Sequence, residues 1–140
     1  MSTPADRETR MSINLFLLFN HRITSIQESD ARNNLDVARI VDMPAELKTL
    51  WRFIPPDLER ISSYLDPIKG WLLQHAQKSD YVLIQGDFGA CFVMVNFTFE
   101  QGLIPLYSAS PRDAHELYRE DGSVKLTHNF RHRIFRKYEK

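Results

Sequence analysis

Three short polar segments of the chain carry side chains that can bind a phosphate or transfer a proton. They are Asn20 and His21, then Gln85, Gly86, Asp87, Phe88 and Gly89, and finally Ser108, Ser110 and Arg112. A histidine titrates near neutral pH and can deprotonate a hydroxyl group, while the planar guanidinium of an arginine can clamp a phosphate. Glycines let the backbone approach a ligand closely because they lack a Cβ atom. This combination predicts a phosphate or nucleotide site with metal-independent chemistry.

Each of these residues also has a structural interpretation, which the sequence leaves open. His21 can simply end a strand at the solvent, and Asp87 can cap the helix that follows it. Ser108 and Ser110 are common turn residues, and Arg112 can pair with a nearby acid. The segment QGDFG matches neither the G-x-G-x-x-G pattern nor a P-loop, so the glycines alone do not establish a nucleotide site.

Composition limits the class of protein. The chain has 140 residues, of which 43% are hydrophobic, a formal net charge of zero and a single cysteine. We therefore expect one domain over residues 11–140, preceded by a disordered leader at 1–10. The lone cysteine favours a cytoplasmic protein, and no apolar run reaches the length of a membrane span. Neutral charge argues against long nucleic acids as partners, and no sequence motif indicates a metal or another cofactor.

Hydrophobic patterning predicts an alternation of strands and helices. Apolar runs of strand length occupy Met11–Asn20, Val37–Met43, Tyr81–Gln85 and Leu103–Ser108. A capping-box pattern that starts at Thr24 or Ser25 predicts a helix running to about Asn34. Helical spacing of apolar residues predicts further helices over residues 47–54 and 57–76, the second kinked or split by Pro67. Phe88–Gln101 has strand propensity, but a parallel strand at Leu103–Ser108 requires a crossover there, so we expect a helix.

These elements predict an α/β fold, with a parallel sheet in the strand order 2-1-3-4 and helices on its faces. Ligands of such sheets bind outside the carboxyl ends of the strands, at the point where the strand order reverses. The three polar segments follow the first, third and fourth strands, so we expect them at one edge. Beyond them, the turn signal Asp121-Gly122 and the β-rich segment SVKLTHNFRHRIFRKYE predict a C-terminal hairpin or a pair of short strands. His132 and its neighbouring arginines have two interpretations, a solvated basic edge and a second phosphate-contacting wall or dimer surface.

Seven segments of the chain resemble, in order, the successive blocks of a Csx-type accessory family of type III CRISPR systems, whose members are proposed ring nucleases. The segments are FLLFNH, IPPDLE, DYVLIQGDFGA, GLIPLYSAS, PRDA, DGSVKLTH and FRKYE. The resemblance implies a Rossmann-like fold related to CARF domains, a homodimer and a pocket for cyclic oligoadenylate, with cyclic tetra-adenylate as the expected ring. It also implies metal-independent cleavage, in which a 2′-hydroxyl attacks the neighbouring phosphate and the antiviral signal ends.

The resemblance assigns roles to the polar segments. Asn20, His21 and the residues from Gln85 to Gly89 contact the ligand, together with Ser108, Ser110 and Arg112, while Ala109 departs from the hydroxyl residue expected there. His21, Ser108 and Arg112 are the expected catalytic residues. A non-catalytic binder of the same messenger, acting as a sponge or a sensor, would use the same pocket. A structural or interaction protein would need none of these residues, and it remains the third alternative.

Overall fold

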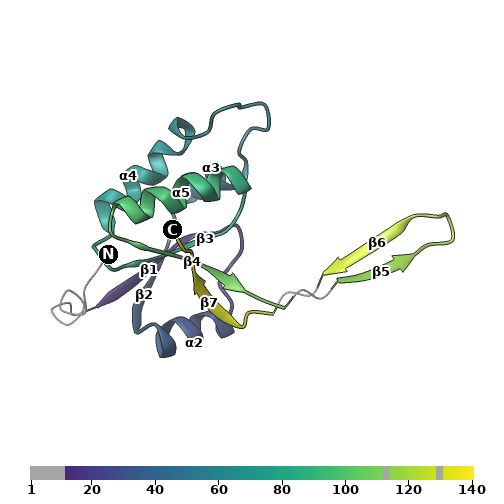
Figure 1. Cartoon of the computed structure of the whole chain (residues 1–140), viewed down its shortest axis with the longest axis horizontal. Helices are drawn as coiled ribbons and strands as arrows, with labels where there is room; N and C mark the ends of the chain where they lie inside the picture. Colours follow the sequence, from purple (N-terminus) through teal and green to yellow (C-terminus); the bar gives the residue numbers. More distant parts are fainter. Residues whose placement is uncertain (1–11, 112–113, 129–130) are drawn as a thin grey trace.

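The computed structural model describes residues 12–111, 114–128 and 131–140. Its centre is a five-stranded sheet with the strand order β2-β1-β3-β4-β7 (Figure 1). The strands are β1 (Ile13–Leu18), β2 (Val37–Asp42), β3 (Tyr81–Ile84), β4 (Ile104–Ala109) and β7 (Ile134–Lys137). The first four are parallel, which confirms the predicted order 2-1-3-4, and β7 adds an antiparallel edge strand beside β4. The predicted leader at 1–10 lies outside the described residues.

Helices cover both faces of the sheet (Figure 1). One face carries α2 (Ser25–Asn34), and the other carries α3 (Ala45–Arg52), α4 (Asp66–His75) and α5 (Phe88–Glu100). Strand β1 is central, so its side chains alternate between two cores. Phe16 and Leu18 pack with Trp51 of α3 and with α4 and α5, while Leu15 and Leu17 pack on the α2 side. A strand buried on both faces therefore reads as a continuous apolar run.

Local sequence signals set the ends of two helices. Thr24 is the N-cap of α2, and Thr24 and Gln27 form the predicted capping box. The crossover helix α5 was expected on topological grounds despite its strand-forming residues, and it is confirmed over Phe88–Glu100. Gly102 follows it with φ +73°, a conformation that glycine adopts without strain. The backbone can thus turn directly from α5 into β4.

The predicted helix over residues 57–76 is wrong in its first half. Residues 53–62 form turns and irregular structure, a short 3-10 turn covers Ser63–Leu65, and α4 begins only at Asp66. Pro67 stands in the first turn of α4, where its missing N–H costs no hydrogen bond. Pro67 therefore starts this helix, and does not kink or split a longer one.

The predicted C-terminal hairpin consists of β5 (Ala114–Tyr118) and β6 (Val124–His128), which pair only with each other in a separate two-stranded sheet. The backbone N–H of Gly122 donates to the carbonyl of Arg119 at the tip, which confirms the predicted turn. In Figure 1 this hairpin projects well beyond the five-stranded sheet. We call residues 114–128 the arm. The chain then returns to the sheet as β7, so the β-rich segment after the turn holds two short strands, β6 and β7, which belong to different sheets.

Candidate functional site

Four strand ends meet at one edge of the sheet. The carboxyl ends of the parallel strands β1, β3 and β4 lie there, and the amino end of β7 lies there too because β7 runs antiparallel. The backbone N–H of Arg133 donates to the carbonyl of Ala109 at 2.8 Å, so residues 131–133 sit beside the end of β4. The segment that leads into β7 therefore contributes side chains to the edge at which the sheet was expected to bind a ligand.

A cavity of about 530 Å³ opens at this edge, between the start of α2 and the ends of β3 and β4. Four of the predicted site residues line it, namely His21, Gln85, Ser108 and Ser110. The remaining lining residues are Phe19, Arg22, Thr24, Ser25, Ile26, Gln27, Arg131 and His132. The cavity thus combines hydroxyl, amide, imidazole and guanidinium groups from four separate parts of the chain. Its volume lies within the usual range of small-molecule sites.

A serine and a histidine that line this cavity form a hydrogen-bonded line with an aspartate of α2. Ser108 Oγ lies 2.5 Å from His132 Nδ1, and His132 Nε2 lies 2.6 Å from Asp30 Oδ2. The His132 side chain is only 3% exposed and that of Asp30 is 14% exposed. Because an ionised carboxylate only accepts, we assign the Nε2 proton to a hydrogen bond with Asp30. With the proton on Nε2, Nδ1 accepts a hydrogen bond from the Ser108 hydroxyl group.

Two glutamines hold Ser108 in place. The Gln27 Nε2 group donates to Ser108 Oγ at 3.3 Å, and Gln85 Oε1 accepts from the Ser108 backbone N–H at 2.7 Å. The orientation of the Gln27 amide follows from the capping box, because its Oε1 atom already accepts from the Thr24 backbone N–H at 2.9 Å. The cap that starts α2 therefore also aims a donor at the site. Gln85 was predicted as a ligand-binding residue, and in the structure it also supports Ser108.

The environment of Asp30 favours its charged form. Burial on its own would raise the pKa of this carboxyl group. Hydrogen bonds from Asn34 and His132, the charge on His132 and the backbone N–H of Phe135 act in the opposite direction and outweigh burial. The pKa of Asp30 is therefore held below its ordinary value of 3.8. An ionised Asp30 fixes the orientation of the imidazole, because its Oδ2 atom accepts from His132 Nε2.

The glycine turn after β3 has structural partners. A Cβ atom on Gly86 would lie 2.9 Å from Trp51 Nε1, which donates to the Gln85 carbonyl at 3.0 Å. Asp87 is the N-cap of α5, and its carboxylate accepts from the Ala90 backbone N–H at 2.9 Å. A carboxylate at this position occupies the site that a phosphate would need. The close approach at Gly86 is thus made by an indole ring, and Asp87 has the capping role that the sequence left open.

The other predicted residues lie in different places. Phe88 and Gly86 line a second groove beside α5, and Gly89 stands in the first turn of that helix near Ile61. The Asn20 backbone carbonyl accepts from Arg52 Nη2 at 2.7 Å. Asn20 Oδ1 is buried and has no hydrogen-bond partner in the described part of the chain. Arg112 lies outside the described residues. The structure therefore gathers four of the ten predicted residues around one cavity.

Sequence reasoning missed Asp30 and Gln27 and left His132 with two interpretations. Gln27 is 6% exposed although α2 looks polar along its whole length. Gln27 and Asp30 are three residues apart, so they share one face of the helix. Two polar residues on the same face as Ala31, which is fully buried, were the available signal. Among the residues that the structure describes, no group of three His, Cys, Asp or Glu side chains is placed to hold a metal ion.

The fold and the site define an α/β protein with a polar cavity at the carboxyl edge of a mostly parallel sheet. The chain belongs to the family described as the uncharacterized protein MJ1673 family, whose model matches residues 13–136. It is 50% identical over 124 residues to "Uncharacterized protein MJ1673" of Methanocaldococcus jannaschii, an alignment that covers 89% of this chain and 95% of that protein. No solved structure matches the chain. In its described part, no helix is both long and apolar enough to cross a membrane.

Proposed function

We propose that this protein is a ring nuclease of type III CRISPR systems, which binds and cleaves cyclic oligoadenylate without a metal ion. Cyclic tetra-adenylate is the expected ring, the expected compartment is the cytoplasm, and the sheet would be a Rossmann-like fold of the CARF type. Ordered sequence segments that resemble the Csx-type family motivate the proposal. The structural observation that carries it is the hydroxyl of Ser108 at the cavity, hydrogen-bonded to His132, which is in turn hydrogen-bonded to Asp30.

In the proposed reaction, the ribose 2′-hydroxyl gives its proton to Ser108 Oγ while Ser108 gives its own proton to His132 Nδ1. The 2′-oxygen then attacks the neighbouring phosphorus, and the bond from phosphorus to the 5′-oxygen breaks. The products are a 2′,3′-cyclic phosphate and a 5′-hydroxyl, whose proton comes from His21 or from water. Asp30 stabilises the imidazolium that forms. Because the substrate carries its own nucleophile, the protein mainly needs to align the reacting groups and move protons.

Positive charge at the cavity suits a phosphate ligand. Arg22 and Arg131 both line it, and an arginine can stabilise the charge that develops on the phosphate oxygens. Arg112 remains a proposed phosphate contact on sequence grounds. A cavity of about 530 Å³ accommodates one part of a four-nucleotide ring. We therefore propose that a homodimer presents two cavities, so that each subunit can act on an equivalent phosphodiester of a two-fold symmetric ring.

One observation favours a non-catalytic binder as the second candidate. Ser108 Oγ is already engaged by both Gln27 and His132, and the His132 side chain is almost fully buried. A network satisfied in this way also gives a binding pocket a fixed shape, with no need for proton transfer. Such a protein would retain cyclic oligoadenylate as a sponge or a sensor. Turnover separates the two candidates.

The test incubates purified protein with labelled cyclic tetra-adenylate in EDTA, and follows binding by gel shift and products by chromatography. We expect linear products that end in 2′,3′-cyclic phosphate. Ser108→Ala and His132→Asn are expected to slow cleavage by at least about tenfold while binding is retained. His75→Ala is the matched control, because His75 is an exposed histidine of α4 on the opposite face of the sheet.

Each other outcome has a defined meaning. Linear products that carry no cyclic phosphate even at the earliest time points would show that water or Ser108, and not the 2′-hydroxyl, attacks the phosphorus. Tight binding without turnover would establish the sponge or sensor. Absence of both binding and cleavage would refute the proposed substrate and leave an interaction protein. Rates near that of the unmodified protein in both variants would refute the proton relay, even if cleavage itself were observed.

A further inference from the structure

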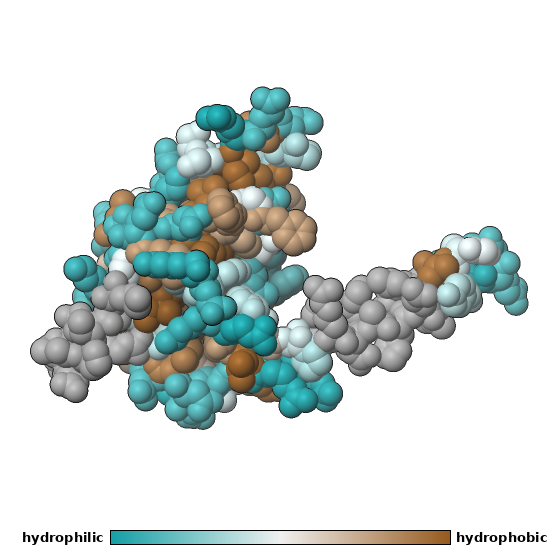
Figure 2. Space-filling model, viewed as in Figure 1, coloured by the Kyte–Doolittle hydropathy of each residue, from teal (hydrophilic) through white to brown (hydrophobic). Residues whose placement is uncertain are grey.

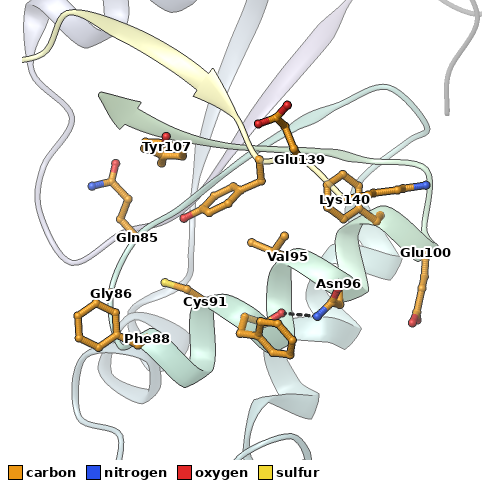
Figure 3. A pocket seen from close by; sticks show the side chains of 13 residues that line it. Gln85, Gly86, Phe88, Cys91, Val95, Asn96, Glu100, Tyr107, Glu139 and Lys140 are labelled. Carbon is orange, nitrogen blue, oxygen red and sulfur yellow. Dashed lines mark hydrogen bonds between the residues drawn. The ribbon is translucent and has the colours of Figure 1, made fainter. Parts of the chain in front are cut away.

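A large groove lies on the other face of the sheet, between α5 and the C-terminal strand. Its volume is about 1130 Å³, and Figure 3 shows Phe88, Cys91 and Val95 of α5 on one side of it, with Tyr107 and the chain end at Lys140 on the other. The wall is ordered by packing and hydrogen bonding. Tyr138 Oη donates to the Ile84 carbonyl at 2.7 Å, and its ring lies 4.9 Å from that of Tyr107. The groove is thus a built feature of the fold.

The rim of this groove exposes two large aromatic side chains. Phe88 is 95% exposed and Phe92 is 72% exposed, and both project from α5. Figure 2 shows apolar surface gathered around the end of α5 nearer to the arm, while polar side chains cover most of the surrounding face. Exposed aromatic clusters of this kind mark interaction sites in proteins, and aromatic anchors contribute strongly to interfaces. A single copy of the chain leaves this surface open to water.

The arm is a second surface of the same kind. Tyr118 and Val124 lie directly opposite each other in the pairing register of β5 and β6, near the tip of the arm. Tyr118 is 76% exposed and Val124 is 50% exposed. An isolated two-stranded hairpin is only marginally stable in water, because it has no face on which to bury its apolar residues. The arm projects away from its own sheet, so the sheet does not supply that face (Figure 1).

We propose that the arm of one copy docks in the α5 groove of a second copy. Each chain carries one exposed apolar pair, Tyr118 and Val124, on its arm and one aromatic groove, so reciprocal docking covers both surfaces and closes a two-fold dimer. Two arm-in-groove contacts per dimer place the exposed aromatic residues at the centre of the interface. This docking mode rests on the arm and the groove alone, and does not depend on the proposed nuclease activity.

The docked arm also bears on the cavity at the sheet edge. The arm is inserted between β4 and β7, and residues on both sides of the insertion, Ser110 before it and Arg131 and His132 after it, line that cavity. A partner that holds the arm therefore holds the two segments from which one cavity wall is made. In this arrangement, formation of the dimer also fixes the position of the two segments that form one wall of the cavity.

The first test measures the mass of the full chain by sedimentation equilibrium across a concentration series. One chain has a mass of 16.4 kDa, and the proposal predicts a species of twice that mass. The groove variant Phe88→Ser/Phe92→Ser and the arm variant Val124→Ser are each expected to weaken dimerisation by at least about tenfold. The matched control is Leu73→Ser, which removes another exposed apolar residue, 58% exposed, from α4 outside the groove. Equal dimerisation in all variants overturns the proposal, and so does a monomer at every concentration.

The second test asks which surfaces meet. In a Cys91→Ala background, a tagged Phe92→Cys chain is mixed with an untagged Val124→Cys chain and mildly oxidised. Arm-in-groove docking predicts disulfides between the two different chains. Disulfides only between two Phe92→Cys chains would show that the α5 faces pair with each other, which overturns the proposal. A third sample is a single chain that carries both Phe92→Cys and Val124→Cys. If disulfides form only within this chain, the arm folds onto its own groove, and the proposal is overturned.

Discussion

The sharpest test of the site concerns the energetic coupling between Asp30 and His132. Their Nε2 and Oδ2 atoms are 2.6 Å apart, and the side chains are 14% and 3% exposed. A hydrogen bond to a charged group contributes about 1.5–3 kcal/mol to stability, and the shielded position of this pair keeps it within that range. Removing only one partner also leaves the other without its hydrogen bond in a poorly solvated place. We therefore expect a coupling free energy of about 2 kcal/mol.

A double-mutant cycle measures this coupling directly. The free energy of unfolding is determined in urea at pH 7 for the unmodified protein, Asp30→Ala, His132→Ala and the double variant. The matched control is the pair Lys48–Asp42, whose charged atoms are 2.7 Å apart while the side chains are 39% and 50% exposed. An exposed pair contributes only about 0.2–1 kcal/mol, so distance alone does not set the result. A coupling for Asp30 and His132 no larger than that of the control pair would refute the inference that burial strengthens this contact.

Three further perturbations have defined outcomes. The pKa of Asp30 is lowered in the folded state, so its contribution to stability is present above its ordinary pKa of 3.8 and is lost as the pH falls through the folded value. Asp30→Asn should therefore show a smaller loss of urea stability between about pH 5 and pH 3 than the unmodified protein, and identical pH profiles would contradict this. Gly86→Ala should cost about 1–3 kcal/mol by overpacking against Trp51, whereas Gly70→Ala in α4, where a Cβ atom meets nothing within 4 Å, should be neutral or stabilising in the same unfolding assay. Burial raises the pKa of the Cys91 thiol to about 11, so its alkylation by iodoacetamide at pH 8 should be about a hundredfold slower in the folded protein than in urea, and equal rates would refute it.

Features that depend on neighbouring residues could be predicted from the sequence. The apolar run around β1 indicated a strand buried on both faces, and Thr24 with Gln27 indicated the start of α2. The order of the parallel strands followed from the alternation of strands and crossover helices, which leaves few possible topologies. The prediction for residues 57–76 failed because helical spacing of apolar residues does not reveal where a chain stays irregular, and Asp66-Pro67 was the true start.

The candidate site shows where local information ends. Ser108 was predicted to be at the carboxyl edge, but its partner His132 is 24 positions away and reaches it only because β7 joins the sheet beside β4. Asp30 is 102 positions from His132 and lies on the helix that covers this side of the sheet. An alternating pattern determines which face of a strand is buried, but it carries no information about which strand becomes its neighbour. The sequence by itself therefore determined the elements and the edge, and tertiary packing decided which side chains meet there, because those contacts join segments that share no local pattern.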